Sequence, residues 1–338
     1  MKNFIFVLLV AFVLSACLSP KEKVQRPTLL RTENATKERL LAEISRFAQI
    51  NSMRAKMDLK FEDNSFAEMG ISEKYKSADG EVVVQRPANI LLKVQIPVLK
   101  TDVAQMTSDG TRFCVAILND GGDGRYRRFV CGSNDKDYSP LQREIQNLEN
   151  GNSKILKQSI NAFANLRPQH FTEAILMRPI SDENIYIQSE IFQEEFDLNT
   201  EKRSPLRWVL RGYYLLDELK RDTDGSLKIL RRFWFDRVGG IRLARQQIFN
   251  QQGQLETDIV YGKEGNLSDQ YTNLPLRIEV TRPKERYKMS LTYQDPTGVS
   301  IGRTYPQTAF ELSNRWNLPE IDLDKKLAEM QAEKNRNR

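Results

Sequence analysis

The feature of this chain that most limits its fold is a regular alternation of apolar and polar residues. In the segment 52–63, every second residue from Met53 to Phe61 is apolar, and the residues between them are charged. Successive side chains of a strand point to opposite faces, so this pattern predicts a β-strand with one buried face. The same period recurs at 82–84, 92–96, 113–117, 276–280 and 287–293. Turn dipeptides such as Asp79-Gly80 separate these segments, which together predict a mainly antiparallel β protein.

Three segments follow a helical period instead. "TKERLLAEISRFAQI" predicts an amphipathic helix over 36–49, capped by Thr36 or Asn34. The segment 139–178 predicts at least two short helices interrupted at Pro168. Within the charged tail 313–338, "EIDLDKKLAEMQAEKNRNR" predicts a charged helix with a thin apolar stripe. We expect this tail to be solvated, with a partner-binding helix as the alternative.

The order of these segments predicts the architecture. A helix, about six strands, helices and about six more strands form one domain over 36–312. Antiparallel strands with one apolar face readily curl into a barrel or half-barrel, and helices can bury their apolar faces on its open side. We therefore expect an α+β fold, an incomplete β-barrel of about 11–12 strands covered by helices.

The N-terminus predicts export and anchoring. The apolar run from Phe4 to Val13 is too short to span a bilayer but fits a signal peptide over 1–16. Leu14-Ser15-Ala16-Cys17 resembles the bacterial lipobox, which implies cleavage before Cys17 and its acylation. Several acyl chains on one residue would anchor the chain stably, with 17–35 as a tether. By analogy with enteric lipoproteins, Leu18 favours the outer membrane; the alternative is an ordinary signal with a chance cysteine.

The two other cysteines flank a Gly/Asp-rich turn in "RFCVAILNDGGDGRYRRFVCG". This segment predicts a β-hairpin, and a turn centred between Gly122 and Asp123 places Cys114 opposite Cys131. Opposed side chains on adjacent strands are close enough for a disulfide, which an oxidising periplasm permits. Two buried thiols on adjacent strands are the alternative.

The order of segments resembles the LolA/LolB-like lipoprotein carrier family over about 36–310. Local likeness lies in "VVVQRPANILLKVQIP", "AQMTSDGTRFCVAI", "RPQHFTEAI", "LPLRIEVTRP" and "YKMSLTY". The resemblance implies an incomplete barrel that encloses an apolar cavity under helices. This chain departs from the family in extra sequence around 190–230 and in its cysteine pair.

The apolar faces of the strands supply the expected cavity lining. These residues are Met57, Leu59, Phe61, Val82, Val84, Leu92, Val94, Phe113, Val115, Ile117, Ile278, Val280, Met289 and Leu291. The resemblance implies that they receive acyl chains of lipoproteins or free lipids at the outer membrane, facing the periplasm. A packed core is the plain alternative, and the fold would then serve as a structural or sensing scaffold for an envelope protein partner.

Other classes of function lack support in the sequence. The chain has no nucleotide-binding loop and no zinc-protease motif, and its single histidine, His170, has no partner that the sequence identifies. We therefore expect no catalytic residue, no metal and no cofactor. Basic and acidic residues are interleaved and the net charge is only +6, so nucleic-acid binding is not expected.

Overall fold

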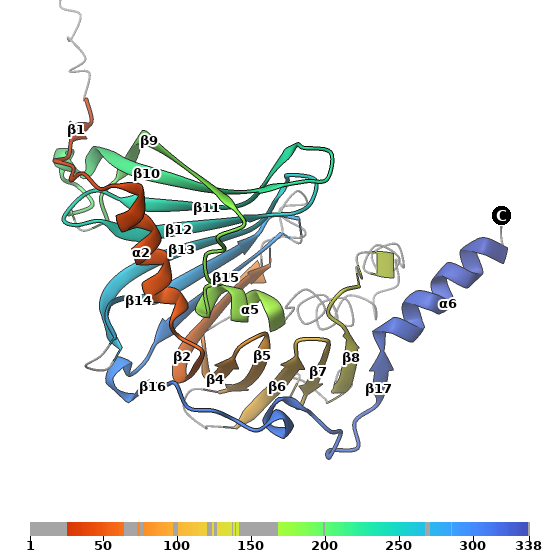
Figure 1. Cartoon of the computed structure of the whole chain (residues 1–338). Helices are drawn as coiled ribbons and strands as arrows, with labels where there is room; N and C mark the ends of the chain where they lie inside the picture. Colours follow the sequence, from red (N-terminus) through yellow and green to blue (C-terminus); the bar gives the residue numbers. More distant parts are fainter. Residues whose placement is uncertain are drawn as a thin grey trace, which may run out of the picture.

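The computed structural model describes residues 26–63, 73–74, 77–96, 101–119, 124, 127–136, 138, 140–141, 168–198, 200–267, 271–284 and 286–336. The signal peptide, Cys17 and nearly all of the predicted helical segment before Pro168 lie outside these residues. Within them the chain forms one sheet of 17 strands, three α-helices and three 3-10 helices (Figure 1).

The strands are β1 Thr28–Leu29, β2 Ser52–Asp63, β3 Glu73–Lys74, β4 Ala78–Gln85, β5 Asn89–Gln95, β6 Asp102–Asp109, β7 Arg112–Ile117, β8 Arg128–Ser133, β9 Ile185–Phe196, β10 Trp208–Arg221, β11 Leu227–Asp236, β12 Arg242–Phe249, β13 Leu255–Leu267, β14 Tyr271–Arg282, β15 Tyr287–Tyr293, β16 Ser300–Ile301 and β17 Glu320–Asp322. The helices are α2 Lys37–Ala48, α5 Pro168–Ile175 and α6 Leu323–Arg336, with 3-10 turns at η2 Pro205–Arg207, η3 Pro296–Gly298 and η4 Gln307–Phe310.

Strand pairing gives the spatial order β9-β10-β11-β12-β13-β14-β15-β2-β4-β5-β6-β7-β8-β17. All of these pairs are antiparallel except β8–β17, which is parallel. Among the described strands no pairing joins β9 to β17, so the sheet stays open, as an incomplete barrel requires. The count exceeds the expected 11–12 strands, in part because β1, β3, β16 and β17 have only two or three residues each.

Strand β2 joins the two sets of strands. Its first part pairs with β4, where Ala55 lies opposite Val82, and its second part also pairs with β15, where Leu59 lies opposite Leu291. The alternation that predicted this strand places its apolar residues on one face. Because the register carries that face across both neighbours, β2 makes the apolar surface continuous between the first and last strands of the chain.

Helices α2 and α5 lie on the same face of the sheet, which we call the inner face. Thr36 caps α2 by accepting a hydrogen bond from the Arg39 backbone N–H, as one of the predicted caps would. The α2 residues Leu40, Ile44 and Phe47 are buried in the same cluster as the inner side chains of the sheet. The described residues therefore show an open sheet with helices on one face, but not a barrel covered by helices.

Helix α6 forms within the predicted charged tail, and its apolar stripe is buried at Leu323, Leu327 and Met330. Its start is held on the sheet by Asp324, which accepts hydrogen bonds from the Ser133 and Tyr138 hydroxyls. Burial opposes ionisation of Asp324, but these bonds and that of Lys136 outweigh it and lower its pKa to about 2. The tail is thus tied to β8 at its beginning.

The predicted hairpin and its cysteine register are confirmed. Strands β7 and β8 pair with Cys114 directly opposite Cys131, and the two residues form a disulfide with Cα atoms 4.2 Å apart. The bridge closes the β7–β8 hairpin near the β17 edge of the sheet.

We predict that Cys114→Ser combined with Cys131→Ser lowers the free energy of unfolding by about 3 kcal/mol, because the bridge restricts the unfolded chain over a loop of this length. Urea denaturation of both proteins without reductant measures the difference. Membrane localisation should not change. Equal stability of the two proteins would show that the bridge adds nothing to the fold.

Candidate functional site on the inner face of the sheet

The structure brings all of the predicted lining residues together in one cluster on the inner face. Leu59, Phe61 and Val94 are partly buried, and the other members of the set are buried. Register rows explain the grouping: Val82 lies opposite Leu92, and Val280 lies opposite Met289. These side chains pack against each other and against the two helices. That they line a cavity for acyl chains stays a prediction.

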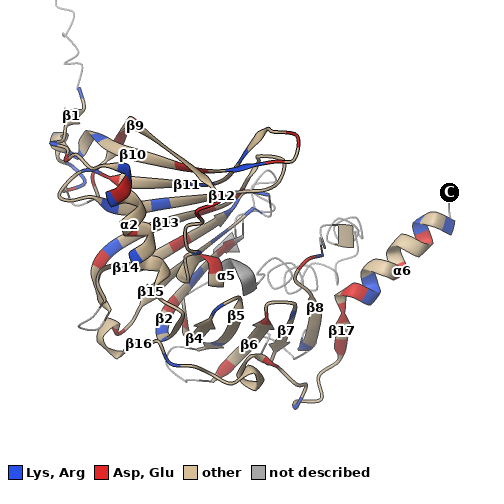
Figure 2. Cartoon of the chain, in the orientation of Figure 1, with Lys and Arg blue, Asp and Glu red and all other residues tan. Residues whose placement is uncertain are grey.

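Over β2, β14 and β15 the opposite face of the sheet is polar, whereas over β7 and β8 it carries a second, smaller apolar cluster that includes Ala116, Phe129 and Leu318. The polar part carries Lys60, Glu62, Arg277, Glu279 and Lys288 in a charged depression. Figure 2 shows that charged residues of both signs are spread over the strands and over α6 rather than gathered in one region. The contrast between the two faces follows directly from the period-two pattern of the sequence.

Helix α5 bridges the two sets of strands across the inner face. It contacts β4, β5 and β6 on one side and β14 on the other. Its buried residues Phe171, Ala174 and Ile175 belong to the same cluster as the strand side chains. Figure 1 shows α5 between the two parts of the sheet, below α2. This helix therefore occupies the position that an apolar ligand on the inner face would need.

A buried ion pair lies on the inner face beside the chain that leaves α5. Glu218 of β10 and Arg231 of β11 are paired in register, and their side chains are each only 3% exposed. Glu218 also accepts hydrogen bonds from Asn184 (2.7 Å) and from the Tyr186 hydroxyl (2.9 Å). Burial opposes ionisation of Glu218, but these bonds and the charge of Arg231 outweigh it and lower its pKa.

Two arginines from opposite parts of the sheet hold the segment that follows α5. Arg231 donates to the carbonyls of Arg178 (2.8 Å) and Pro179 (3.0 Å). Arg86, in the β4–β5 turn, donates to the Met177 carbonyl and to the Ala48 carbonyl at the end of α2. The exit of α5 is therefore fixed by directional bonds, whereas the helix itself is held mainly by apolar packing.

A second polar group lies under α5. Arg282 of β14 is buried and donates to the Thr257 hydroxyl of β13 at 2.5 Å. Glu173 of α5 is half-buried nearby. Burial raises the pKa of its carboxyl, and the positive charges of Arg178 and Arg282 offset this only in part. Helix α5 thus carries an acid that is poorly solvated in its present position.

The sequence analysis missed the buried Glu218–Arg231 ion pair. The signal was present, because Glu218 and Arg231 occupy positions of the period that otherwise hold apolar residues such as Leu216 and Phe233. Only the register shows that the two break the pattern at opposed positions. The aromatic residues of β11 also alternate between the two faces of the sheet. Phe233 and Phe235 lie in the core, whereas Trp234 lies on the outer face under Arg245.

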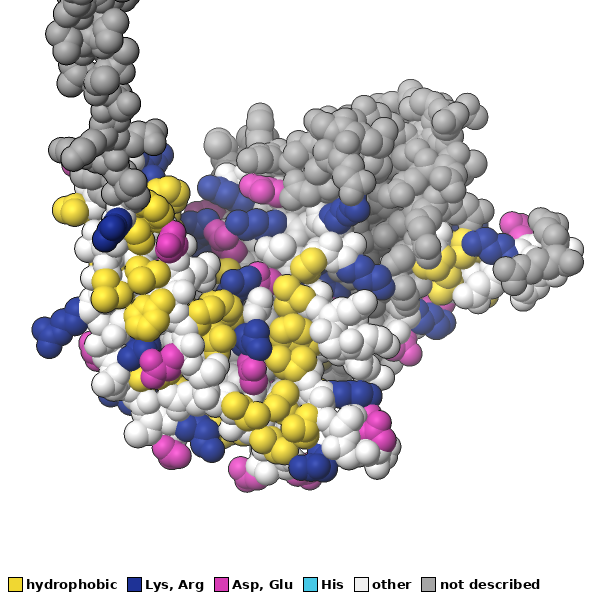
Figure 3. Space-filling model, turned by 90° about the horizontal axis from the view of Figure 1, so that it is seen from above, with side chains coloured by type: hydrophobic (Ala, Val, Ile, Leu, Met, Phe, Trp, Pro, Cys, Tyr) yellow, Lys and Arg dark blue, Asp and Glu magenta, His cyan; other side chains and the backbone are white. Residues whose placement is uncertain are grey.

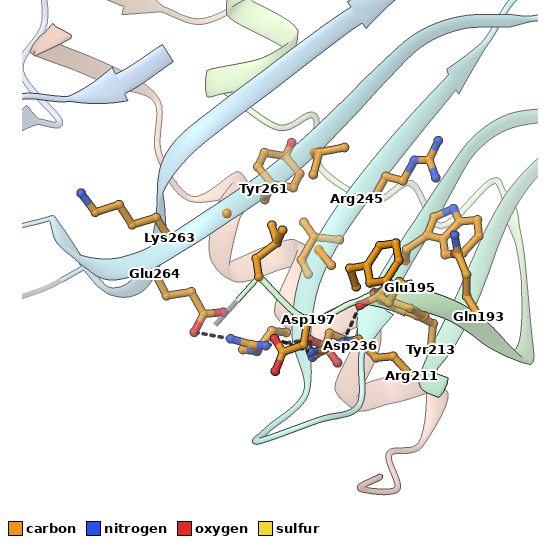
Figure 4. A pocket seen from close by; sticks show the side chains of 18 residues that line it. Gln193, Glu195, Asp197, Arg211, Tyr213, Asp236, Arg245, Tyr261, Lys263 and Glu264 are labelled. Atoms are coloured by element: carbon orange, nitrogen blue, oxygen red, sulfur yellow. Dashed lines mark hydrogen bonds and ion pairs between the residues drawn. The ribbon is translucent and has the colours of Figure 1, made fainter. Parts of the chain in front are cut away.

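A separate open pocket of about 550 Å³ lies on the strands β9 to β13 (Figure 4). Arg211 pairs there with Glu195 (2.6 Å) and Asp236 (2.9 Å), and Arg242 pairs with Asp236 and Glu264. Burial opposes the charge of Arg211, but Asp236 and Glu195 outweigh it and raise its pKa. The charges of this pocket are thus arranged in a chain of ion pairs.

In the part of the chain that the structure describes, no three His, Cys, Asp or Glu residues lie close enough together to hold a metal ion. No helix within the same residues combines the length and apolar character needed to cross a membrane.

Comparison with known proteins gives similarity at the level of structure only. No protein-family model and no curated protein matches the chain. It is similar to a LolA superfamily protein from Nitrosomonas europaea (12% identity, covering 82% of this chain and 99% of that one). It is also similar to a DUF1329 family protein from Desulfovibrio piger, with 9% identity over 81% of this chain and 95% of that one. A third similar structure is a domain from Vibrio parahaemolyticus provisionally assigned to outer membrane lipoprotein sorting, with 8% identity over 81% of this chain and 95% of that one.

All three comparisons have a TM-score of 0.39. One of the three proteins carries the family name that the sequence resemblance suggested.

We predict that Arg231→Met lowers the free energy of unfolding by about 3–5 kcal/mol, because it leaves the Glu218 carboxylate buried without its counter-charge. Urea denaturation measures this loss. The double variant Glu218→Met/Arg231→Met should recover part of it, since no buried charge then remains.

The pair Asp217–Arg232 provides a matched control, because it lies on the other face of the same two strands and is partly exposed. Arg232→Met should cost only about 0–1 kcal/mol. Similar losses for Arg231→Met and Arg232→Met would contradict the importance of the buried pair.

We predict that Glu173→Gln stabilises the protein at neutral pH. A raised pKa means that the folded state holds the proton more tightly than the unfolded chain. The free energy of unfolding therefore falls as the pH rises from the unfolded pKa, near 4.5, through the folded one. Thermal unfolding from about pH 4 to about pH 8 should show a melting-temperature gain that grows with pH. The exposed Glu183→Gln serves as control, and a gain independent of pH would refute the assignment.

Proposed function

We propose that this chain is a lipid-anchored envelope protein that binds the acyl chains of lipoproteins or lipids on the inner face of its sheet. The observation that carries the proposal is the continuous apolar surface across β2, which one short helix bridges from one set of strands to the other. Acyl chains would take the place of α5, so binding requires α5 to move away from the sheet. The protein acts by shielding its ligand from water and performs no chemistry on it.

The energetics favour such an exchange. Each methylene group transferred from water to an apolar surface contributes about 0.8 kcal/mol. Helix α5 has eight residues, and isolated helices shorter than about 12–15 residues are marginal in water. Its stability therefore depends on the packing that a ligand would replace. Moving α5 would also return Glu173 to water, where its ionised form is better solvated.

The bonds from Arg231 and Arg86 give this motion a fixed end. They hold the carbonyls of Met177, Arg178 and Pro179, so α5 could swing away while its exit stays on the sheet. Acylation of Cys17 would tether the protein to the outer membrane facing the periplasm, beside the membrane that supplies or receives the ligand.

Photolabelling tests the proposal. The mature protein is illuminated with a palmitic acid analogue that carries a diazirine near its chain end, and the labelled residues are mapped by mass spectrometry. We expect labels at inner-face residues such as Met57, Leu92 and Met289, with competition by unlabelled palmitate. Labels confined to exposed residues such as Leu227 would contradict the proposal.

A second candidate is a scaffold that binds a protein partner and no lipid. The observation that favours it is the burial of the lining residues against each other and against α5, as in an ordinary core. Under this alternative the inner face takes up no label. Crosslinking in whole cells would instead recover one envelope protein in fixed proportion.

A further inference from the structure

Large apolar side chains are exposed at one end of the molecule. They are Leu29 of β1, Phe192 and Phe196 of β9, Leu198 of the β9–β10 loop and Leu206 of η2. We call this set the apolar end. The exposed fraction reaches 85% at Leu198 and is above 60% at Phe196, Leu206 and Leu29. Figure 3 shows hydrophobic side chains exposed in this part of the molecule.

Strand pairing explains why these residues lie together. Phe196 is opposite Trp208 at the last pair of β9 and β10, and the Asp197 N–H donates to the Arg207 carbonyl to close the loop. Leu29 lies opposite Leu210 of β10 through the parallel pairing of β1. The described residues of the loop 197–207, the end of β9 and the strand β1 therefore share one end of the sheet.

The N-terminal chain connects this end to the predicted anchor. Thr28 is fixed on the sheet by β1, and only ten residues lie between it and Cys17. A chain of that length spans at most about 40 Å when fully extended, and about 20 Å on average when flexible. Acyl chains on Cys17 would therefore hold the apolar end close to the bilayer, whereas no such constraint applies to the far end of β10.

The charges beside the apolar end also suit a membrane surface. Arg26, Arg31, Lys202 and Arg203 are exposed there. Arg207 lies over the Phe196 ring, 5.3 Å from its centre. The acidic residues Glu194 and Glu201 are exposed in the same region and reduce the net positive charge. Aromatic, leucine and basic side chains together are typical of surfaces that lie in the headgroup region of a bilayer.

We propose that the apolar end is a bilayer-contact surface, which inserts its Phe and Leu side chains among the headgroups of a phospholipid membrane. This contact is additional to the acyl anchor and does not depend on what the inner face binds. It would orient the sheet relative to the membrane, because the β9–β10 loop and β1 would contact the bilayer while the other end of β10 would point away from it. Phe196 and Leu198, which also line the open pocket, would lie at this contact.

Vesicle flotation tests the proposal without the acyl anchor. The full mature chain with Cys17→Ser is mixed with vesicles of phosphatidylethanolamine and phosphatidylglycerol. We expect the protein to float with the vesicles. Leu198→Asp combined with Leu206→Asp should weaken its partition at least roughly tenfold, since two apolar side chains are lost and two negative charges are added.

Leu227→Asp is the matched control. Leu227 is an exposed leucine in the pairing of β10 with β11, at the opposite end of β10, and its change should leave the partition unaltered. The palmitate photolabelling described above should also survive in the double variant, which separates this inference from the proposed function.

Three results would overturn the inference. The first is a parent chain that does not float, and the second is a double variant that floats as well as the parent. The third is a parent that sediments as a dimer and becomes a monomer in the double variant, which would assign the apolar end to a second copy of this chain.

Discussion

The structure depends on covering one apolar face of an open sheet. The register through β2 extends that face from the first strands of the chain to the last, and a sheet that does not close cannot bury it alone. Helices α2 and α5, together with the apolar stripe of α6, supply the described part of the cover. Helix α2 is well capped and has 12 residues, whereas α5 has eight and relies on its contacts with the strands. The cover is therefore weakest where it bridges the two sets of strands.

The buried Glu218–Arg231 ion pair holds the segment that follows α5 on the sheet. Glu218 and Arg231 would be an unusual choice for stability alone, because apolar residues of similar size often serve as well. Here Arg231 also binds two carbonyls after α5, and Arg86 binds a third from the other side of the sheet. The pair thus couples the position of the α5 exit to the first strands of the second set. Glu173 of α5, whose pKa is raised by burial, works against the closed position.

Much of the architecture could be predicted from the sequence, and the limits have physical causes. The period of two identified β2, β4, β5, β7, β14 and β15, and the hairpin spacing identified the Cys114–Cys131 bridge, because both are local features. The long strands β9 to β13 were expected only as members of a second set of strands, because their apolar residues do not alternate as regularly. The short strands β1 and β17 could not be predicted, since two or three residues contain no period. The inner-face position of the Glu218–Arg231 pair depends on register between strands, which a local pattern does not contain. The cover by α5 depends on packing between distant segments.

Hydrogen exchange of α5 tests the central claim most directly. The backbone amides of 171–177 are followed in the mature protein with and without a saturating short-chain lysophospholipid. If acyl chains replace α5 on the inner face, these amides should lose protection on ligand binding, while those of β4 to β6 keep theirs. If the ligand binds and the protection of α5 is unchanged or increased, α5 is a fixed part of the core and the account is wrong.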